Sequence, residues 1–101
     1  MSNYDRYYKI SKYLRTHYPF NYPINVRRVK MPDDYCGDCE LINEKYIIKI
    51  NKQLPENEAI DTLLHEMGHA KAWEKEEEFH GTIWGKEYSK IYRAYEKKFL
   101  E

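Results

Sequence analysis

The sequence predicts a single α+β domain, and three observations lead to this prediction. The chain has 101 residues, the size of one small domain. Apolar residues recur at spacings of three and four in three separate stretches, as in amphipathic helices. Two short segments rich in β-branched residues stand between the first and second of these stretches. We expect residues 1–101 to form an N-terminal helix, a small antiparallel sheet or hairpin, and two further helices.

The first helix is expected over residues 3–15, followed by Pro19 and Pro23, which do not continue it. Its apolar and aromatic positions keep helical spacing: Tyr4, Tyr7, Tyr8, Ser11 and Leu14.

Residues 24–29 and the β-rich segment Tyr46–Ile50 are both expected to be strands. The loop over residues 32–39 separates them, and a minor strand is expected near Leu41 and Ile42. This order predicts a hairpin or a short antiparallel meander.

The second helix is expected to begin at Pro55 and its acidic neighbours and to run to about Lys75. The third is expected to follow a cap at Thr82. Its core-facing positions again keep helical spacing: Trp84, Tyr88, Ile91, Tyr92, Tyr95 and Phe99.

The composition argues against several classes of protein. Seventeen basic and seventeen acidic residues give a net charge of zero, so there is no strong signal for nucleic-acid binding. No apolar stretch resembles a signal-peptide core or a membrane span, and we expect a soluble, cytoplasmic protein. The sequence does not indicate an oligomeric state.

Cys36 and Cys39 are expected to be reduced thiols in a tight turn. A structural zinc site needs four ligands, and only His17 remains as a spare histidine, so a zinc site between subunits is the minor alternative.

The central feature is the HExxH motif His65-Glu66-Met67-Gly68-His69, which lies within the expected second helix. Residues four apart project from one face of a helix, so the two histidines can bind one zinc ion. Glu66 is then placed to act as the general base toward a metal-activated water.

A catalytic zinc ion usually has three protein ligands, and His80 is the first candidate for the third. Glu87 and Glu74 are the alternatives. The short metzincin spacing is excluded, because it requires histidine where this chain has Lys75.

The motifs resemble those of the SprT-like zincin metallopeptidases. The matching segments are His65–Ala70 and His80–Trp84, which reads HGTIW, and the likeness extends upstream to about Tyr46. The resemblance implies a zincin-like fold, one zinc ion held by His65, His69 and His80, and Glu66 as general base. We expect a minimal catalytic core without a zinc ribbon.

These observations predict a zinc-dependent metallopeptidase that acts on a protein or peptide substrate. An extended substrate is expected to pair with a sheet edge formed by residues 46–51. Tyr88 or Tyr92 is a candidate for stabilising the oxyanion, although packing also explains both residues. Two alternatives stay open: a catalytically inactive, zinc-stabilised binding module, and a regulatory peptidase that acts on a single partner.

Overall fold

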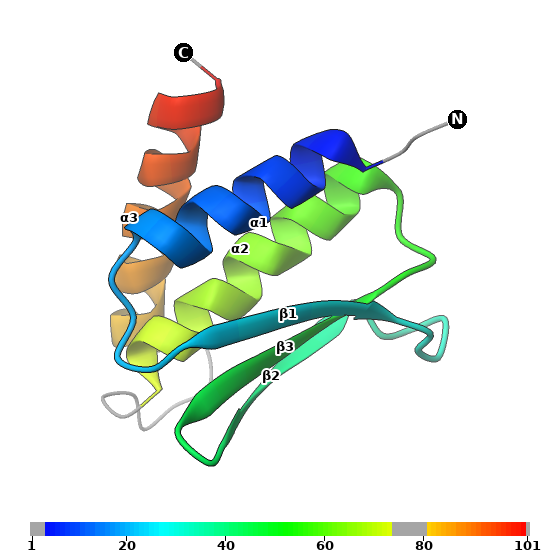
Figure 1. Cartoon of the computed structure of the whole chain (residues 1–101), viewed down its shortest axis with the longest axis horizontal. Helices are drawn as coiled ribbons and strands as arrows, with labels where there is room; N and C mark the ends of the chain where they lie inside the picture. The colour runs from blue at the N-terminus through cyan, green and yellow to red at the C-terminus, as the bar shows by residue number, and fades with distance from the viewer. Residues whose placement is uncertain (1–3, 74–80, 101) are drawn as a thin grey trace.

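The computed structural model describes residues 4–73 and 81–100. These residues form three helices and a three-stranded sheet, which confirms the α+β prediction (Figure 1). The elements are α1 (Asp5–His17), β1 (Ile24–Val29), β2 (Gly37–Ile42), β3 (Lys45–Asn51), α2 (Glu56–Ala72) and α3 (Thr82–Phe99). The expected boundaries agree to within a few residues, except that Gly81 and not Thr82 occupies the cap position of α3.

The strands form one mixed sheet in the order β1-β3-β2. β2 and β3 form an antiparallel hairpin, with Asn43 and Glu44 at positive φ in its turn. β1 runs parallel to β3, so the prediction of an antiparallel meander was wrong. The substrate edge expected at residues 46–51 was also wrong, because β3 is the central strand and is paired on both sides.

The parallel pairing arises because residues 30–36 carry the chain past the end of β3, from one side of it to the other. Asn51, the last residue of β3, holds this crossing loop. Its buried side-chain amide donates to the carbonyl oxygens of Pro32 and Tyr35, at 3.2 and 2.8 Å. Its backbone N–H donates to the carbonyl oxygen of Cys36 at 2.8 Å.

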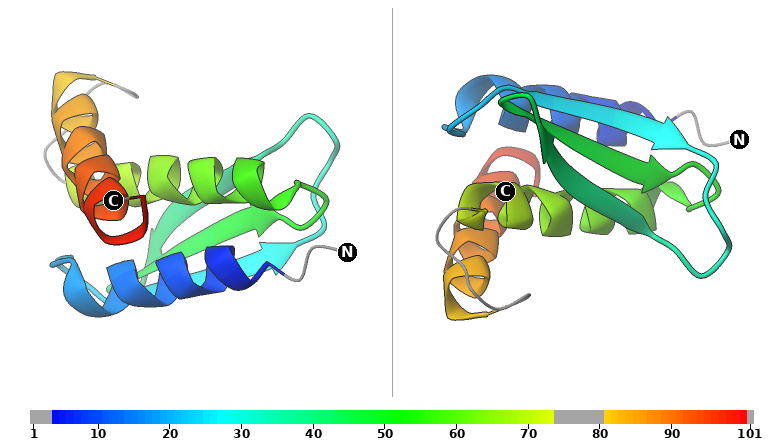
Figure 2. Two further views of the ribbon diagram at one scale, coloured as in Figure 1. Left: turned by 90° about the horizontal axis from the view of Figure 1, so that it is seen from above. Right: turned by 90° about the horizontal axis from the view of Figure 1, so that it is seen from below.

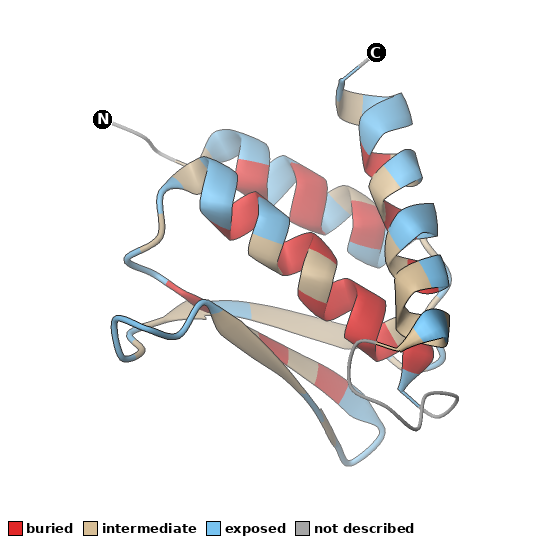
Figure 3. Ribbon diagram, turned by 180° about the vertical axis from the view of Figure 1, so that it is seen from behind, coloured by how far each residue is buried: buried red, intermediate tan, exposed pale blue. Residues whose placement is uncertain are grey.

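The helices α1 and α2 lie on the same face of the sheet, and α3 packs across one end of α2 (Figure 2). Figure 3 shows that the buried positions of α2 face the sheet and the other two helices. The core is apolar and draws on every helix and on β3; its most buried members include Ile10, Leu14, Ile48, Ile50, Leu63, Leu64, Met67 and Ile91. Among the described residues, no helix is both long enough and apolar enough to cross a membrane.

The start of α2 also fixes the start of α1. The Glu56 carboxylate accepts a hydrogen bond from the backbone N–H of Tyr7 at 3.2 Å, in the first turn of α1. Nearby, the Tyr4 hydroxyl donates to the carbonyl oxygen of Leu54. Because the first N–H groups of a helix have no partner within it, Glu56 satisfies a donor that would otherwise need water.

Candidate metal centre

His65 and His69 lie one turn apart on α2, so their rings project from the same side of the helix. The ring centroids are 4.9 Å apart and the two Nε2 atoms are 3.2 Å apart. Two nitrogen ligands of a tetrahedral zinc ion, each about 2.0–2.1 Å from the metal, would be separated by about 3.3 Å. The two imidazoles therefore fit a shared zinc ion. The same separation suits a hydrogen bond between the rings, and metal titration distinguishes the two.

Trp84, in the first turn of α3, packs against both histidines. Its ring is stacked on that of His69 at a centroid distance of 5.6 Å and lies 5.1 Å from that of His65. The indole N–H also donates to the backbone carbonyl oxygen of His65 at 3.3 Å. Trp84 therefore restricts the positions of both imidazoles, as outer residues around a metal site do.

Gly68 allows α3 to approach the histidine pair this closely. A Cβ atom at this position would lie 2.9 Å from the Trp84 indole nitrogen and 3.2 Å from Cβ of Tyr88. The first distance is shorter than a Cβ atom normally tolerates. The glycine within the HExxH motif is thus required by the packing of α2 on α3.

Glu66 is the buried acid of the site, with 7 % of its surface exposed. Burial raises its pKa from 4.5 to about 7, and the Asp38 carboxylate on β2 adds to the effect. A carboxyl group with a pKa near neutrality can both accept and return a proton at physiological pH. The environment of Glu66 is therefore suited to proton transfer.

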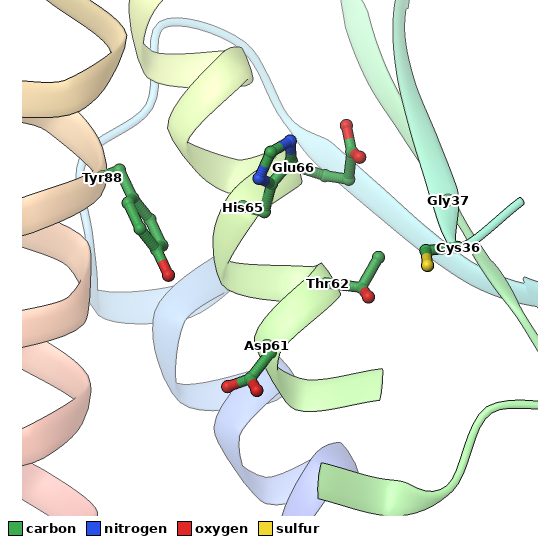
Figure 4. A pocket seen from close by; sticks show the side chains of 7 residues that line it. All are labelled: Cys36, Gly37, Asp61, Thr62, His65, Glu66 and Tyr88. Atoms are coloured by element: carbon green, nitrogen blue, oxygen red, sulfur yellow. The ribbon is translucent and has the colours of Figure 1, made fainter. Parts of the chain in front are cut away.

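An open pocket of about 440 Å³ lies beside His65 and Glu66. Its walls come from three places: the middle of α2, one residue of α3, and the chain entering β2 (Figure 4). The lining residues are Cys36, Gly37, Asp61, Thr62, His65, Glu66 and Tyr88. A pocket with a buried acid and a histidine at one side is the arrangement expected of a catalytic site.

The wall at the start of β2 is close to α2 because residue 37 is glycine. A Cβ atom there would lie 2.6 Å from the Lys49 carbonyl oxygen and 2.9 Å from the Thr62 methyl group. Cys36, just before it, is exposed and lines the pocket, while Cys39 lies in β2. Both cysteines are free thiols, and burial raises the pKa of Cys39 to about 12.

Of the three candidates for a third ligand, the structure describes only Glu87. His80 and Glu74 lie outside the described residues. Glu87 is buried on α3, forms an ion pair with Lys90 at 3.6 Å, and its charge acts on Tyr18. Within residues 4–73 and 81–100, no three metal-binding side chains come together, so Glu87 does not join the histidine pair.

The sequence also matches a known protein family. A model of the SprT-like family matches residues 5–99, almost the entire chain. The chain belongs to the SprT-like family. The resemblance inferred from the two motifs is thereby confirmed. Searches of curated proteins and of solved structures find no match.

In this SprT-like chain, three residues contribute to the site in ways that the sequence did not indicate. Trp84 was interpreted as a core residue and Cys36 as part of a loop, and no role was inferred for Gly68. Each contacts the site only through packing between distant segments. The one available signal was the position of Trp84 within the second motif. Tyr88 does line the pocket, with its ring 6.4 Å from that of His65, whereas Tyr92 lies one turn further along α3 and does not.

Proposed function

We propose that this SprT-like chain is a zinc-dependent metallopeptidase that hydrolyses peptide bonds in protein or peptide substrates. The observation that carries the proposal is the 3.2 Å separation of the His65 and His69 Nε2 atoms, beside a pocket that also exposes Glu66. Family membership supports the same class of reaction. A purely structural zinc site would not need an acid at an open pocket.

The roles of the residues follow from where they lie. His65 and His69 hold the zinc ion, which when bound lowers the pKa of a water molecule and polarises the scissile carbonyl group. Glu66 accepts a proton from the attacking water and later passes it to the leaving amine. Trp84 keeps His65 and His69 in position through ring packing and its bond to the His65 carbonyl oxygen.

We assign the third ligand to His80. This residue directly precedes Gly81, the cap of α3, and the first turn of α3 rests on both histidine rings through Trp84. The chain therefore enters α3 close to the two histidines that are proposed to bind the metal. Glu87 is a poorer candidate, because its carboxylate forms an ion pair with Lys90 and its charge acts on Tyr18.

The substrate is expected to lie along β2. This strand is at the edge of the sheet, and the residues just before it and at its start, Cys36 and Gly37, line the pocket. An extended peptide that pairs with an edge strand has its backbone fixed by main-chain hydrogen bonds. A substrate strand on β2 would therefore pass beside His65 and Glu66.

Metal analysis tests the site. The wild-type protein should bind about one zinc ion per chain, whereas His65→Ala, His69→Ala and His80→Ala should each weaken binding by at least about tenfold. His17→Ala, at the exposed end of α1, is the matched control and should bind zinc normally. Unchanged affinity in His65→Ala would refute the metal site.

Hydrolysis of a denatured protein tests the reaction. Glu66→Gln should keep its zinc and lose hydrolysis by a factor of at least about one hundred. Wild-type protein that binds zinc but hydrolyses nothing would instead identify an inactive binding module.

A further inference from the structure

The pocket beside the proposed metal site contains a carboxylate that the proposed reaction does not use. Asp61 lies one turn before His65 on α2, so its side chain projects from the same side of the helix. Apart from Glu66, which the proposed reaction uses, Asp61 is the one carboxylate among the described residues that line the pocket. None of those lining residues is a lysine or an arginine. A bound substrate thus meets a negative charge at Asp61.

Asp61 is available to a ligand. Its side chain is exposed, and within the described parts of the chain it has neither an ion pair nor a hydrogen bond. Its charge nevertheless acts on Tyr88, which lines the same pocket. Burial raises the pKa of the Tyr88 hydroxyl, and the Asp61 carboxylate raises this pKa further. Asp61 and Tyr88 therefore face the same space from two helices, as Figure 4 shows.

The shape of the pocket suits a long side chain with a charged end. The Tyr88 ring lines the pocket from α3, across from α2, and provides an apolar surface near Asp61. Lysine and arginine combine an aliphatic stem with a cationic tip, and they bury the stem while the tip reaches a polar partner. A volume of about 440 Å³ accommodates either side chain.

We propose that Asp61 makes this a pocket for lysine or arginine, so that the enzyme prefers substrates with a basic residue next to the cleaved bond. The inference rests on the proposed peptidase function. The stem of the substrate side chain lies along Tyr88, and its cation pairs with the Asp61 carboxylate. This pairing orients the peptide with its scissile bond beside Glu66.

Quenched fluorescent peptides that differ at one position test the preference. In the wild type, kcat/KM for the lysine and arginine peptides should exceed that for the glutamine peptide by about tenfold, as expected for a charged hydrogen bond. Asp61→Asn should bring the ratio close to one, and Asp61→Lys should favour the glutamate peptide. Glu58→Gln removes the same charge from an exposed position on α2 outside the pocket, and it should keep the wild-type ratio.

Peptide binding, measured by fluorescence anisotropy on Glu66→Gln, separates this inference from the reaction itself. Hydrolysis without a basic preference, or with a preference that survives in Asp61→Asn, overturns the assignment of Asp61 and leaves the peptidase intact. Absence of hydrolysis, together with lysine-selective binding that Asp61→Asn abolishes, overturns the peptidase and supports the pocket. Absence of both overturns both.

Discussion

The indole N–H of Trp84 donates a hydrogen bond to the backbone carbonyl oxygen of His65, 3.3 Å away. This bond joins the first turn of α3 to the residue of α2 that carries the first proposed metal ligand. The same indole ring is stacked on His69 at 5.6 Å. One residue of α3 thus determines how both imidazoles of α2 are held.

Replacing Trp84 by phenylalanine should weaken zinc binding by about tenfold, the usual effect of losing a supporting contact around a metal site. An aromatic ring remains in Trp84→Phe, but the hydrogen bond to His65 is lost. A competition titration against a chromogenic chelator measures the affinity. Trp73→Phe is the control because that tryptophan lies at the end of α2 and is 39 % exposed. Equal affinity in the two variants would contradict the role given to Trp84.

Replacing Gly68 on α2 and Gly85 on α3 by alanine should change the free energy of unfolding in opposite directions. Gly68→Ala forces a Cβ atom to within 2.9 Å of the Trp84 indole nitrogen and should cost about 1–3 kcal/mol. Gly85→Ala, on α3, places its Cβ atom in open space and should stabilise the helix by about 0.5–1 kcal/mol. Urea unfolding gives both values, and a stabilising Gly68→Ala would refute the close approach.

The Glu56 carboxylate should stabilise α1 from outside that helix. In Glu56→Ala the Tyr7 N–H loses its partner, and the free energy of unfolding should fall by about 1 kcal/mol. Glu58→Ala removes a carboxylate from the same first turn of α2 without touching α1 and is the matched control. If the free energy of unfolding falls equally in both variants, the loss arises within α2 and not from the hydrogen bond to Tyr7 of α1.

Tyr7 should make the fold sensitive to alkaline pH. Its side chain is 1 % exposed, and within the described residues its hydroxyl has no hydrogen-bond partner. Burial raises the pKa of Tyr7 from 10.0 to about 12. Between these values the unfolded chain releases the proton and the folded chain keeps it, so stability is full below pH 10 and falls as the pH rises toward 12.

Tyr7→Phe removes this dependence. Its free energy of unfolding at pH 8 should equal the wild-type value or exceed it by up to about 1 kcal/mol, because an unpaired buried hydroxyl is lost. By pH 11 the advantage should grow by about 1 kcal/mol. Tyr8→Phe, at a side chain that is 52 % exposed, should follow the wild type. A constant difference between Tyr7→Phe and the wild type across pH 8–11 would contradict the prediction.

The parts of this molecule that depend on local spacing were predictable from sequence. Helical periodicity placed His65 and His69 on one face of α2, and the β-rich composition of Tyr46–Ile50 predicted strand β3. The direction of β1 was not predictable, because it depends on the loop that Asn51 holds at the end of β3. The sequence pattern assigned no role to Asn51, whereas its buried side chain anchors this loop.

The candidate site was predictable only where it lies on a single helix. His65, Glu66 and His69 lie on two consecutive turns of α2. Asp61 and Cys36 become part of the site only because α3 and the start of β2 pack beside α2 and complete the pocket. The spacing of residues along the sequence does not predict the distance between α2 and α3. That distance depends on Gly68, whose lack of a side chain admits Trp84.

The unequal environments of the two thiols give a way to observe the site directly. Cys36 is exposed at the pocket, whereas Cys39 is half-buried in β2 with a pKa raised to about 12. A thiol-reactive dye should therefore label Cys36 in the native protein and leave Cys39 unmodified. The wild-type sequence thus carries its own attachment point for a fluorescent reporter of metal and peptide binding.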